Sequence, residues 1–311
     1  MIFSNYTNNF NNIFIKMKVK LLDNTCSHEP LFYSTKNQDK IEIIKNGTIE
    51  KGDLVICTNS FFPKVEKIKK HRNCKNIAYL CESYEGELRW YNWIKNNTHL
   101  FDIILTWNKE LLEMNPEKFK LQLFGTTWIP ESERKIHQKS KLSSIIVSNS
   151  RSKTGHKLRH TITDHLLQNK DLVDIDFFGR RFGNLPPPQC IGSETVYSLH
   201  HPSNRKVDAL KNYMFTICIL PSKVDYEFDE KLIDSFLTGT VPIFWGCPSI
   251  GKFFNIQGML IFNTFEECIE LLKKITKEMY YEMLPHIEDN FERAKKYTHF
   301  RFNEDEILKL V

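Results

Sequence analysis

Glu230-Lys231-Leu232-Ile233-Asp234-Ser235-Phe236-Leu237-Thr238-Gly239-Thr240-Val241-Pro242-Ile243-Phe244-Trp245-Gly246 is the stretch of sequence that decides the fold. It predicts a short helix, a glycine stop and a buried strand. Gly239 suits the position just after a helix end, where a residue without a Cβ most easily adopts the left-handed backbone conformation. Residues 241–245 are too uniformly apolar for a strand with one face in water, so they predict a strand of a parallel sheet.

The predicted helix begins with two charged residues that suit a phosphate ligand. The N-terminus of a helix carries about half a positive charge and several unpaired N–H groups, so it attracts a diphosphate. Lys231 would add a full positive charge there, and Glu230 would accept hydrogen bonds from ribose hydroxyls. The pattern therefore predicts an enzyme that holds a sugar nucleotide by its diphosphate.

The composition is that of a globular protein with about two domains. The chain has 311 residues, 41% of them apolar, which is ample for two cores. Its net charge of +5 suits a small anionic ligand and is too weak to indicate nucleic-acid binding. The eight cysteines include no Cys-x-x-Cys pair, which disfavours a zinc site and favours free thiols in a reducing compartment.

No segment has the pattern of a membrane span or of a secretion signal. A span needs about 20 consecutive apolar residues, and the Asn- and Phe-rich start of the chain lacks a charged region followed by an apolar one. We expect a cytoplasmic protein without a transmembrane segment, at most peripheral at a membrane. The oligomeric state stays open.

Strands alternate with helices along the whole chain, which favours parallel α/β sheets. In the first half we expect strands at residues 19–22, 54–58, 76–80 and 103–106, and helices at 65–71, 87–96 and 109–114. The charged segment 131–143 predicts an interdomain linker. In the second half we expect strands at residues 144–149, 174–179 and 215–220, helices at 155–169 and 265–275, and a mostly helical end from 278.

Two α/β halves joined by a linker place a cleft between them. Open parallel sheets bind ligands beyond the carboxyl ends of their strands, so two facing sheets make one interdomain site. The expected fold class is therefore α/β of the GT-B type, with two Rossmann-like domains and an interdomain cleft. We place the first domain at residues 1–140 and the second at 141–311, with the last helix packing back on the first domain.

The second half resembles the α1,3/4-fucosyltransferase family. The resemblance rests on a strand and loop, Phe215-Thr216-Ile217-Cys218-Ile219-Leu220-Pro221-Ser222, then on Glu227-Phe228-Asp229-Glu230-Lys231, and then on the Gly239-Thr240-Val241-Pro242 turn. It is clear from about residue 145 to 290 and weak in the first half. A Glu-Lys pair followed by Gly-Thr-Val-Pro at this spacing is fairly specific, whereas Gly-Thr-Val-Pro alone is not.

The resemblance implies an inverting transfer of fucose from GDP-fucose to a hydroxyl of an oligosaccharide acceptor in glycan biosynthesis, without a metal or other cofactor. Lys231 and Arg159 would hold the diphosphate and Glu230 the ribose. Glu82, which ends a predicted strand, would be the catalytic base. The remaining donor-site candidates are the family's Ser-Asn strand end and residues of the two loops near the expected nucleotide, namely Asn149, Arg180, Ser222, Tyr226 and Glu227.

Three positions depart from the family pattern. Leu220-Pro221 replaces a Glu-Asn pair, Glu227 replaces a tyrosine, and Asp229 replaces a threonine. Tyr226 would supply the missing aromatic ring if the loop is shifted by one residue. The added acids repel a diphosphate unless Lys231 and Arg159 compensate. Two alternatives follow, a transferase that uses another nucleotide sugar and a catalytically inactive homologue that binds a nucleotide or sugar.

Two further patterns resemble metal sites, but the sequence favours other roles for them. Asp174-Ile175-Asp176 matches the Asp-x-Asp shape that holds a metal and diphosphate in another transferase class, yet it lies at a predicted strand start. His156 and His160, and the adjacent pair His200-His201, lack an acidic or cysteine partner at a usable spacing. We therefore predict no metal site.

Overall fold

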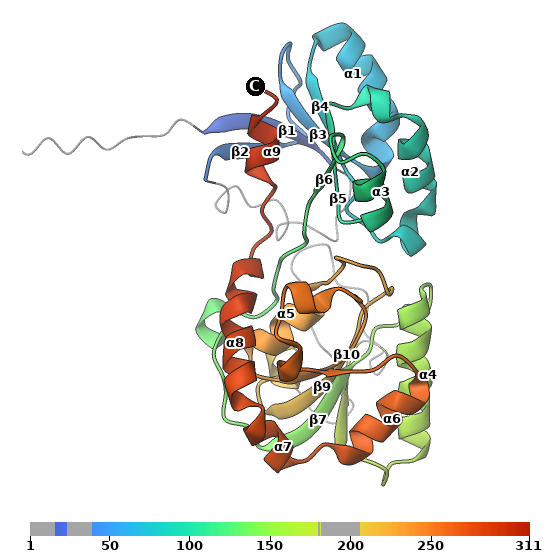
Figure 1. Ribbon diagram of the computed structural model, residues 1–311, viewed down its shortest axis with the longest axis vertical. Coiled ribbons are helices and arrows are strands. Elements are labelled where there is room, and N and C mark those ends of the chain that lie inside the picture. Colours follow the sequence, from blue (N-terminus) through green and yellow to red (C-terminus); the bar gives the residue numbers. More distant parts are fainter. Residues whose placement is uncertain (1–15, 24–38, 180, 182–205) are drawn as a thin grey trace, which may run out of the picture.

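The computed structural model describes residues 16–23, 39–179, 181 and 206–311. Its strands form two separate sheets, one above the other in Figure 1, and every strand pairing is parallel. Helices cover the faces of both sheets, because a parallel sheet is buried on both sides. The expected α/β class is confirmed.

The first sheet has the strand order β2-β1-β3-β4-β5-β6. Its strands are β1 (Met17–Leu22), β2 (Ile41–Lys45), β3 (Leu54–Thr58), β4 (Lys75–Tyr79), β5 (Ile103–Thr106) and β6 (Phe119–Leu121). Three helices accompany it: α1 (Val65–Arg72), α2 (Tyr84–Asn96) and α3 (Lys109–Met114). We call the part of the chain packed around this sheet the first domain.

Alternate residues of the first sheet enter two different cores, because neighbouring strand residues point to opposite faces. Cys57 and Ala78 pack with the helices, for example against Tyr91 of α2. Ile56 and Tyr79 face the other way, and the chain's C-terminal segment covers them. This segment brings three buried side chains to the first sheet, Phe300, Phe302 and Ile307, the last from α9 (Glu304–Leu308).

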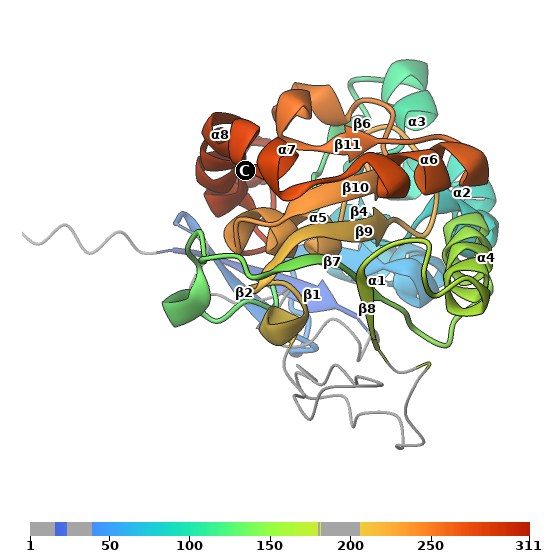
Figure 2. The same cartoon turned by 90° about the horizontal axis from the view of Figure 1, so that it is seen from below.

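The second sheet has the order β11-β10-β9-β7-β8. Its strands are β7 (Lys141–Ile146), β8 (Ile175–Phe178), β9 (Tyr213–Ile219), β10 (Val241–Trp245) and β11 (Leu260–Ile261). On one face lie α4 (Thr154–Gln168) and α6 (Phe265–Lys274), which Figure 2 shows side by side. On the other lie α5 (Glu230–Leu237) and α8 (Leu284–Ala294), with α7 (Lys277–Glu282) leading into α8.

The quoted stretch folds as its pattern predicts. Helix α5 begins at Glu230 and strand β10 spans Val241–Trp245, with all five residues of the strand buried. Gly239 has φ +69°. A Cβ atom at Gly239 would lie 2.8 Å from Cγ2 of Ile136 and 2.9 Å from its Cα, so the turn needs glycine for both conformation and space.

Two strands of the first sheet were not predicted, and the expected end of the linker is wrong. Strands β2 and β6 were not predicted, because β2 has the mixed sequence Ile-Glu-Ile-Ile-Lys and β6 has only three residues. Strand β7 begins at Lys141, so the last residues of the expected linker 131–143 belong to the second sheet. Lys139 just before it is buried, and its ammonium group donates to the carbonyl of Thr238 at 2.7 Å.

The chain crosses between the domains twice, and the two crossings are hydrogen-bonded to each other. The side-chain amide of Gln122 donates to the carbonyl of Arg301 at 2.8 Å, and its oxygen accepts from the Asn303 N–H at 2.8 Å. Gly125 lies against the backbone of Tyr297, where a Cβ would come within 3.2 Å.

None of the helices in the described ranges combines the length and the apolar character that crossing a membrane requires.

Candidate functional site

Two adjoining cavities lie where the carboxyl ends of the strands meet. The first, which we call the α5 cavity, has a volume of about 320 Å³ and is walled by the second sheet, the start of α4 and the start of α5. The second, the interdomain cavity, has a volume of about 260 Å³ and has walls from both domains. Trp128 and Glu230 line both cavities, so the two cavities share part of their wall.

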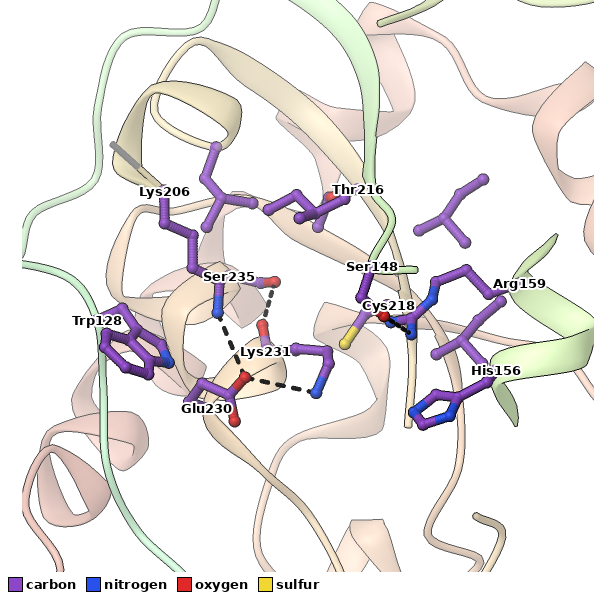
Figure 3. Close-up of a pocket in the computed structure, with 14 residues that line it drawn as sticks. Trp128, Ser148, His156, Arg159, Lys206, Thr216, Cys218, Glu230, Lys231 and Ser235 are labelled. Atoms are coloured by element: carbon purple, nitrogen blue, oxygen red, sulfur yellow. Dashed lines mark hydrogen bonds and ion pairs between the residues drawn. The ribbon is translucent and has the colours of Figure 1, made fainter. Parts of the chain in front are cut away.

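Arg159 of α4 supplies a buried positive charge to the α5 cavity. Its side chain is 3% exposed, and its Nη2 donates to Oγ of Ser148 at 3.1 Å (Figure 3). Its Nε atom finds no hydrogen-bond acceptor among the described residues. A buried N–H of a charged group without a partner is costly, so this guanidinium group favours an anionic ligand.

Lys231 stands on the opposite wall, in the first turn of α5. Its ammonium group is ion-paired with Asp229 and lies 3.4 Å from Oε1 of Glu230. Burial opposes the charge, but these two carboxylates outweigh it and raise the pKa of Lys231. Asp229 is also the N-cap of α5, accepting from the Lys231 N–H at 3.0 Å. An anion at this helix start therefore exchanges with carboxylates that already pair with the lysine.

Glu230 lies between two lysines. Its Oε1 is 3.4 Å from Nζ of Lys231 and 3.6 Å from Nζ of Lys206 (Figure 3). Burial would raise the pKa of this carboxyl, but Lys231 and Lys206 more than offset it, so the pKa falls to about 2. Glu230 is thus a permanently ionised acceptor, a suitable partner for the hydroxyl groups of a ribose.

The interdomain cavity contains a carboxyl group from each domain. Glu82 follows β4, and its Oε2 lies 3.8 Å from Nζ of Lys153. Glu227 comes from the segment between β9 and α5, is 9% exposed, and accepts from Oγ of Ser222 at 3.0 and 3.2 Å. Burial raises the pKa of Glu227 to about 7, despite that hydrogen bond, and the negative charge of Asp229 adds to the rise. One carboxyl group from each domain thus lines this cavity.

Contacts between the domains hold this arrangement together. The Glu85 carboxylate of α2 accepts from the Thr154 N–H at 2.8 Å and from its Oγ1 at 2.5 Å, at the start of α4. The first turn of α4 also abuts the end of β9, since a Cβ at Gly155 would lie 1.8 Å from the carbonyl oxygen of Leu220. Arg159 and Glu82 are therefore positioned relative to each other through α4.

The structure brings some of the predicted site residues together and leaves others apart. Arg159, Glu230 and Lys231 meet in the α5 cavity, and Glu82 and Glu227 in the interdomain cavity. Three residues line neither cavity: the exposed Asn149, the buried Ser222 that supports Glu227, and Tyr226. Arg180 lies outside the described residues.

Tyr226, the candidate for the missing aromatic ring, packs beside the two cavities without lining either of them. Its backbone has φ +64°, its N–H donates to Oγ of Ser249 at 2.9 Å, and its hydroxyl accepts from Nζ of Lys252 at 2.9 Å. Its ring packs edge-on against Phe253. These contacts direct the ring and hydroxyl of Tyr226 toward Phe253 and Lys252.

Sequence reasoning missed Lys206, Trp128 and the site role of His156, all of which line the α5 cavity. Burial, together with the charges of Arg159 and Lys153, lowers the pKa of His156 to about 4, so its imidazole is neutral near pH 7. Its Nδ1 lies 2.8 Å from Oγ of Ser150. Lys206 and Trp128 belong to no motif, and no periodic pattern in the sequence indicated them.

Comparison with known proteins places this geometry in context. No family model matches the chain. The α-(1,3)-fucosyltransferase FucT of Helicobacter pylori is 30% identical over 102 residues, which are 31% of this chain and only 21% of that protein. A crystal structure of an α1,3-fucosyltransferase is similar with a TM-score of 0.56 and 17% identity, covering 94% of this chain and 91% of that one.

A second crystal structure, of an α1,3-fucosyltransferase with GDP-fucose, has a TM-score of 0.52 and 16% identity, covering 94% of this chain and 90% of that one. At these identities the structural likeness establishes the fold, which is GT-B with two Rossmann-like domains. Together with the sequence match, it confirms the resemblance to α1,3-fucosyltransferases that the motifs predict.

Glu227 generates a prediction about stability and pH. Because its folded-state pKa is raised from 4.5 to about 7, the folded protein binds a proton that the unfolded chain has lost, so stability falls as pH rises through this interval. Glu227→Gln should therefore stabilise the fold by up to about 3 kcal/mol at pH 8, at about 1.4 kcal/mol per pKa unit, and hardly at all below pH 4.5. Urea unfolding at both pH values measures this gain.

Glu282→Gln, a change at an exposed residue of α7, is the matched control and should have no pH-dependent effect of this size. An equal gain for Glu227→Gln at both pH values would mean that the buried charge is not its cause.

Proposed function

We propose that this protein is an inverting glycosyltransferase that moves fucose from GDP-fucose to a hydroxyl group of an oligosaccharide acceptor. One observation carries the proposal. A cavity with three cationic side chains, Arg159, Lys206 and Lys231, adjoins a cavity with carboxyl groups from both domains, and Glu230 lines both cavities. The sequence match to an α-(1,3)-fucosyltransferase supports fucose as the transferred sugar.

The diphosphate of the donor would bind between Arg159 and Lys231. A guanidinium group grips phosphate oxygens through two parallel donors, whereas an ammonium group adds a point charge. Both groups stabilise the negative charge that builds on the departing GDP. The buried Nε atom of Arg159 and the N–H groups at the start of α5 complete a polar wall for this group.

Glu82 would act as the base. It takes the proton of the acceptor hydroxyl, whose oxygen forms a bond to the anomeric carbon while the bond from that carbon to the phosphate oxygen breaks. The electron pair leaves with GDP, and attack from the face opposite the diphosphate inverts the anomeric centre. Charge stabilisation by Arg159 and Lys231 does here what a metal ion does in other transferases.

A transferase that uses another nucleotide sugar is the second candidate. Glu227, which stands in place of the family's tyrosine, places a buried carboxyl group in the interdomain cavity. Such a group favours donor sugars whose hydroxyl or amino groups donate to it. An inactive nucleotide- or sugar-binding homologue is the remaining alternative, since Asp229 already pairs with Lys231.

Calorimetry with GDP, UDP, CMP and their sugars tests these candidates, followed by transfer assays on a panel of oligosaccharides. Binding of GDP-fucose and release of GDP in the presence of an acceptor support the proposal. Transfer with a different nucleotide sugar supports the second candidate. Nucleotide binding without any transfer supports the inactive homologue. No binding of any nucleotide refutes both transferase candidates and leaves only an inactive sugar-binding homologue.

Lys231→Ala should weaken GDP binding and lower turnover by roughly tenfold or more, the scale of one lost charge-assisted contact. The loss also leaves Asp229 and Glu230 without the lysine that pairs with them. Lys223→Ala is the control, because this exposed lysine lines neither cavity and contacts Asn263. Unchanged GDP affinity and turnover in Lys231→Ala would remove this residue from the site.

Glu82→Gln should abolish transfer and leave GDP affinity intact, since the amide keeps the shape of the side chain and cannot accept the proton. Glu87→Gln controls for a general effect on α2, because Glu87 pairs with Arg89 and lines neither cavity. Steady-state transfer rates and calorimetry of each variant measure the two effects. Retained transfer in Glu82→Gln would refute its role as the base.

A further inference from the structure

Lys206 is a buried lysine in the wall of the α5 cavity. It begins the 3₁₀ turn Lys206–Ala209, and its side chain is 10% exposed. Its Nζ lies 2.6 Å from Oδ2 of Asp234 and 3.6 Å from Oε1 of Glu230. Figure 3 shows the ammonium groups of Lys206 and Lys231 directed at the same oxygen of the Glu230 carboxylate.

Asp234 fixes the position of this lysine. It lies one helical turn after Glu230 on the same face of α5, and its side chain is fully buried. Its Oδ1 accepts from Oγ1 of Thr127 at 2.5 Å and from the Trp128 N–H at 3.0 Å. Thr127 and Trp128 belong to the crossing between the domains. The carboxylate that pairs with Lys206 is therefore fixed by hydrogen bonds from this crossing.

Charges around Glu230 change when a diphosphate binds. Glu230 has two cationic neighbours, Lys231 and Lys206. A phosphate group that engages Lys231 would share the charge of this lysine with Glu230 and bring negative charge close to that carboxylate. Lys206 would then be the main cation that keeps Glu230 ionised and oriented, because its 2.6 Å ion pair with Asp234 holds its ammonium group in the cavity wall.

We propose that Lys206 is a positioning residue for ribose recognition, which holds Glu230 in place as the acceptor for the ribose hydroxyl groups once the diphosphate has engaged Lys231. The inference rests on the proposed function, because it takes the ligand to be a ribonucleoside diphosphate. Lys206 reaches the ligand through Glu230, and Asp234 balances its charge so that no excess positive charge is left in the core.

The ratio of the affinities for a ribonucleotide and for its dideoxy analogue measures this role. Calorimetry on the full chain compares GDP with 2′,3′-dideoxy-GDP, and UDP with 2′,3′-dideoxy-UDP. The unmodified protein should bind the ribonucleotide of its preferred base roughly tenfold or more tightly than the dideoxy analogue, which lacks the hydroxyl groups that donate to Glu230. In Lys206→Met this ratio should fall to about two. Lys206→Arg, which keeps the charge, should restore most of it.

Lys206→Met leaves Asp234 buried without its cation, so the single variant can lose stability. The double variant Lys206→Met/Asp234→Asn removes both charges and keeps an oxygen for Thr127 and Trp128. It should fold, as shown by its unfolding transition, and still lose the discrimination. Lys141→Met is the matched control, because Lys141 forms a similar 2.6 Å ion pair with Asp176 and lines neither cavity.

The outcomes separate the two proposals. The role of Lys206 would be overturned if both Lys206→Met and the double variant kept the unmodified protein's ratio of ribonucleotide to dideoxynucleotide affinity, even if both affinities fell. A protein that binds GDP and its dideoxy analogue equally well would overturn it too, while leaving the proposed transferase intact. No binding of any of the four nucleotides to the unmodified protein would overturn both proposals.

Discussion

The balance of buried charge at the start of α5 is the constraint on which the rest of the site depends. Two lysines, Lys206 and Lys231, pack there with three carboxylates, Asp229, Glu230 and Asp234. The Lys206–Asp234 pair is buried, and the other three side chains are 17–28% exposed. Removing one partner of such a buried pair costs about 3–5 kcal/mol, because the other charge is left uncompensated. We therefore expect the set to stay complete, and the diphosphate of the proposed donor would bind by exchange for carboxylates.

The fold serves to bring this charge set to the edge of a second, independent domain. Strand β10 and the Gly239 turn place the start of α5 beside the end of β9, and the first turn of α4 closes on the same point. The two hydrogen-bonded crossings and the C-terminal segment then fasten the first domain above it. Glu82 reaches the interdomain cavity because β4 ends there, and the link from Glu85 to Thr154 joins that loop region to α4.

The residues that depart from the fucosyltransferase pattern lie in different structural surroundings. Leu220 is buried in the apolar core against Gly246 and lines neither cavity, so its replacement of a polar residue is a matter of packing. Glu227 does line a cavity, and it carries a carboxyl group whose proton affinity is set by burial. Asp229 became the cap of α5 and the partner of Lys231. The three differences therefore act on separate features: Leu220 on core packing, Glu227 on the interdomain cavity, and Asp229 on the start of α5.

Local patterns in the sequence determined the elements with strong periodicity and the residues that belong to a motif. The short helix, the glycine turn and the buried strand of residues 230–246 follow from neighbours a few positions apart, whereas Arg159 was indicated by the resemblance to the fucosyltransferases. Short edge strands such as β2 and β6 carry too few residues for a pattern. The partners of Asp234 were decided by tertiary structure alone. Lys206, Thr127 and Trp128 meet this residue of α5 from segments far away in the chain, and only tertiary packing brings their charge and hydrogen-bonding groups within reach of its carboxylate.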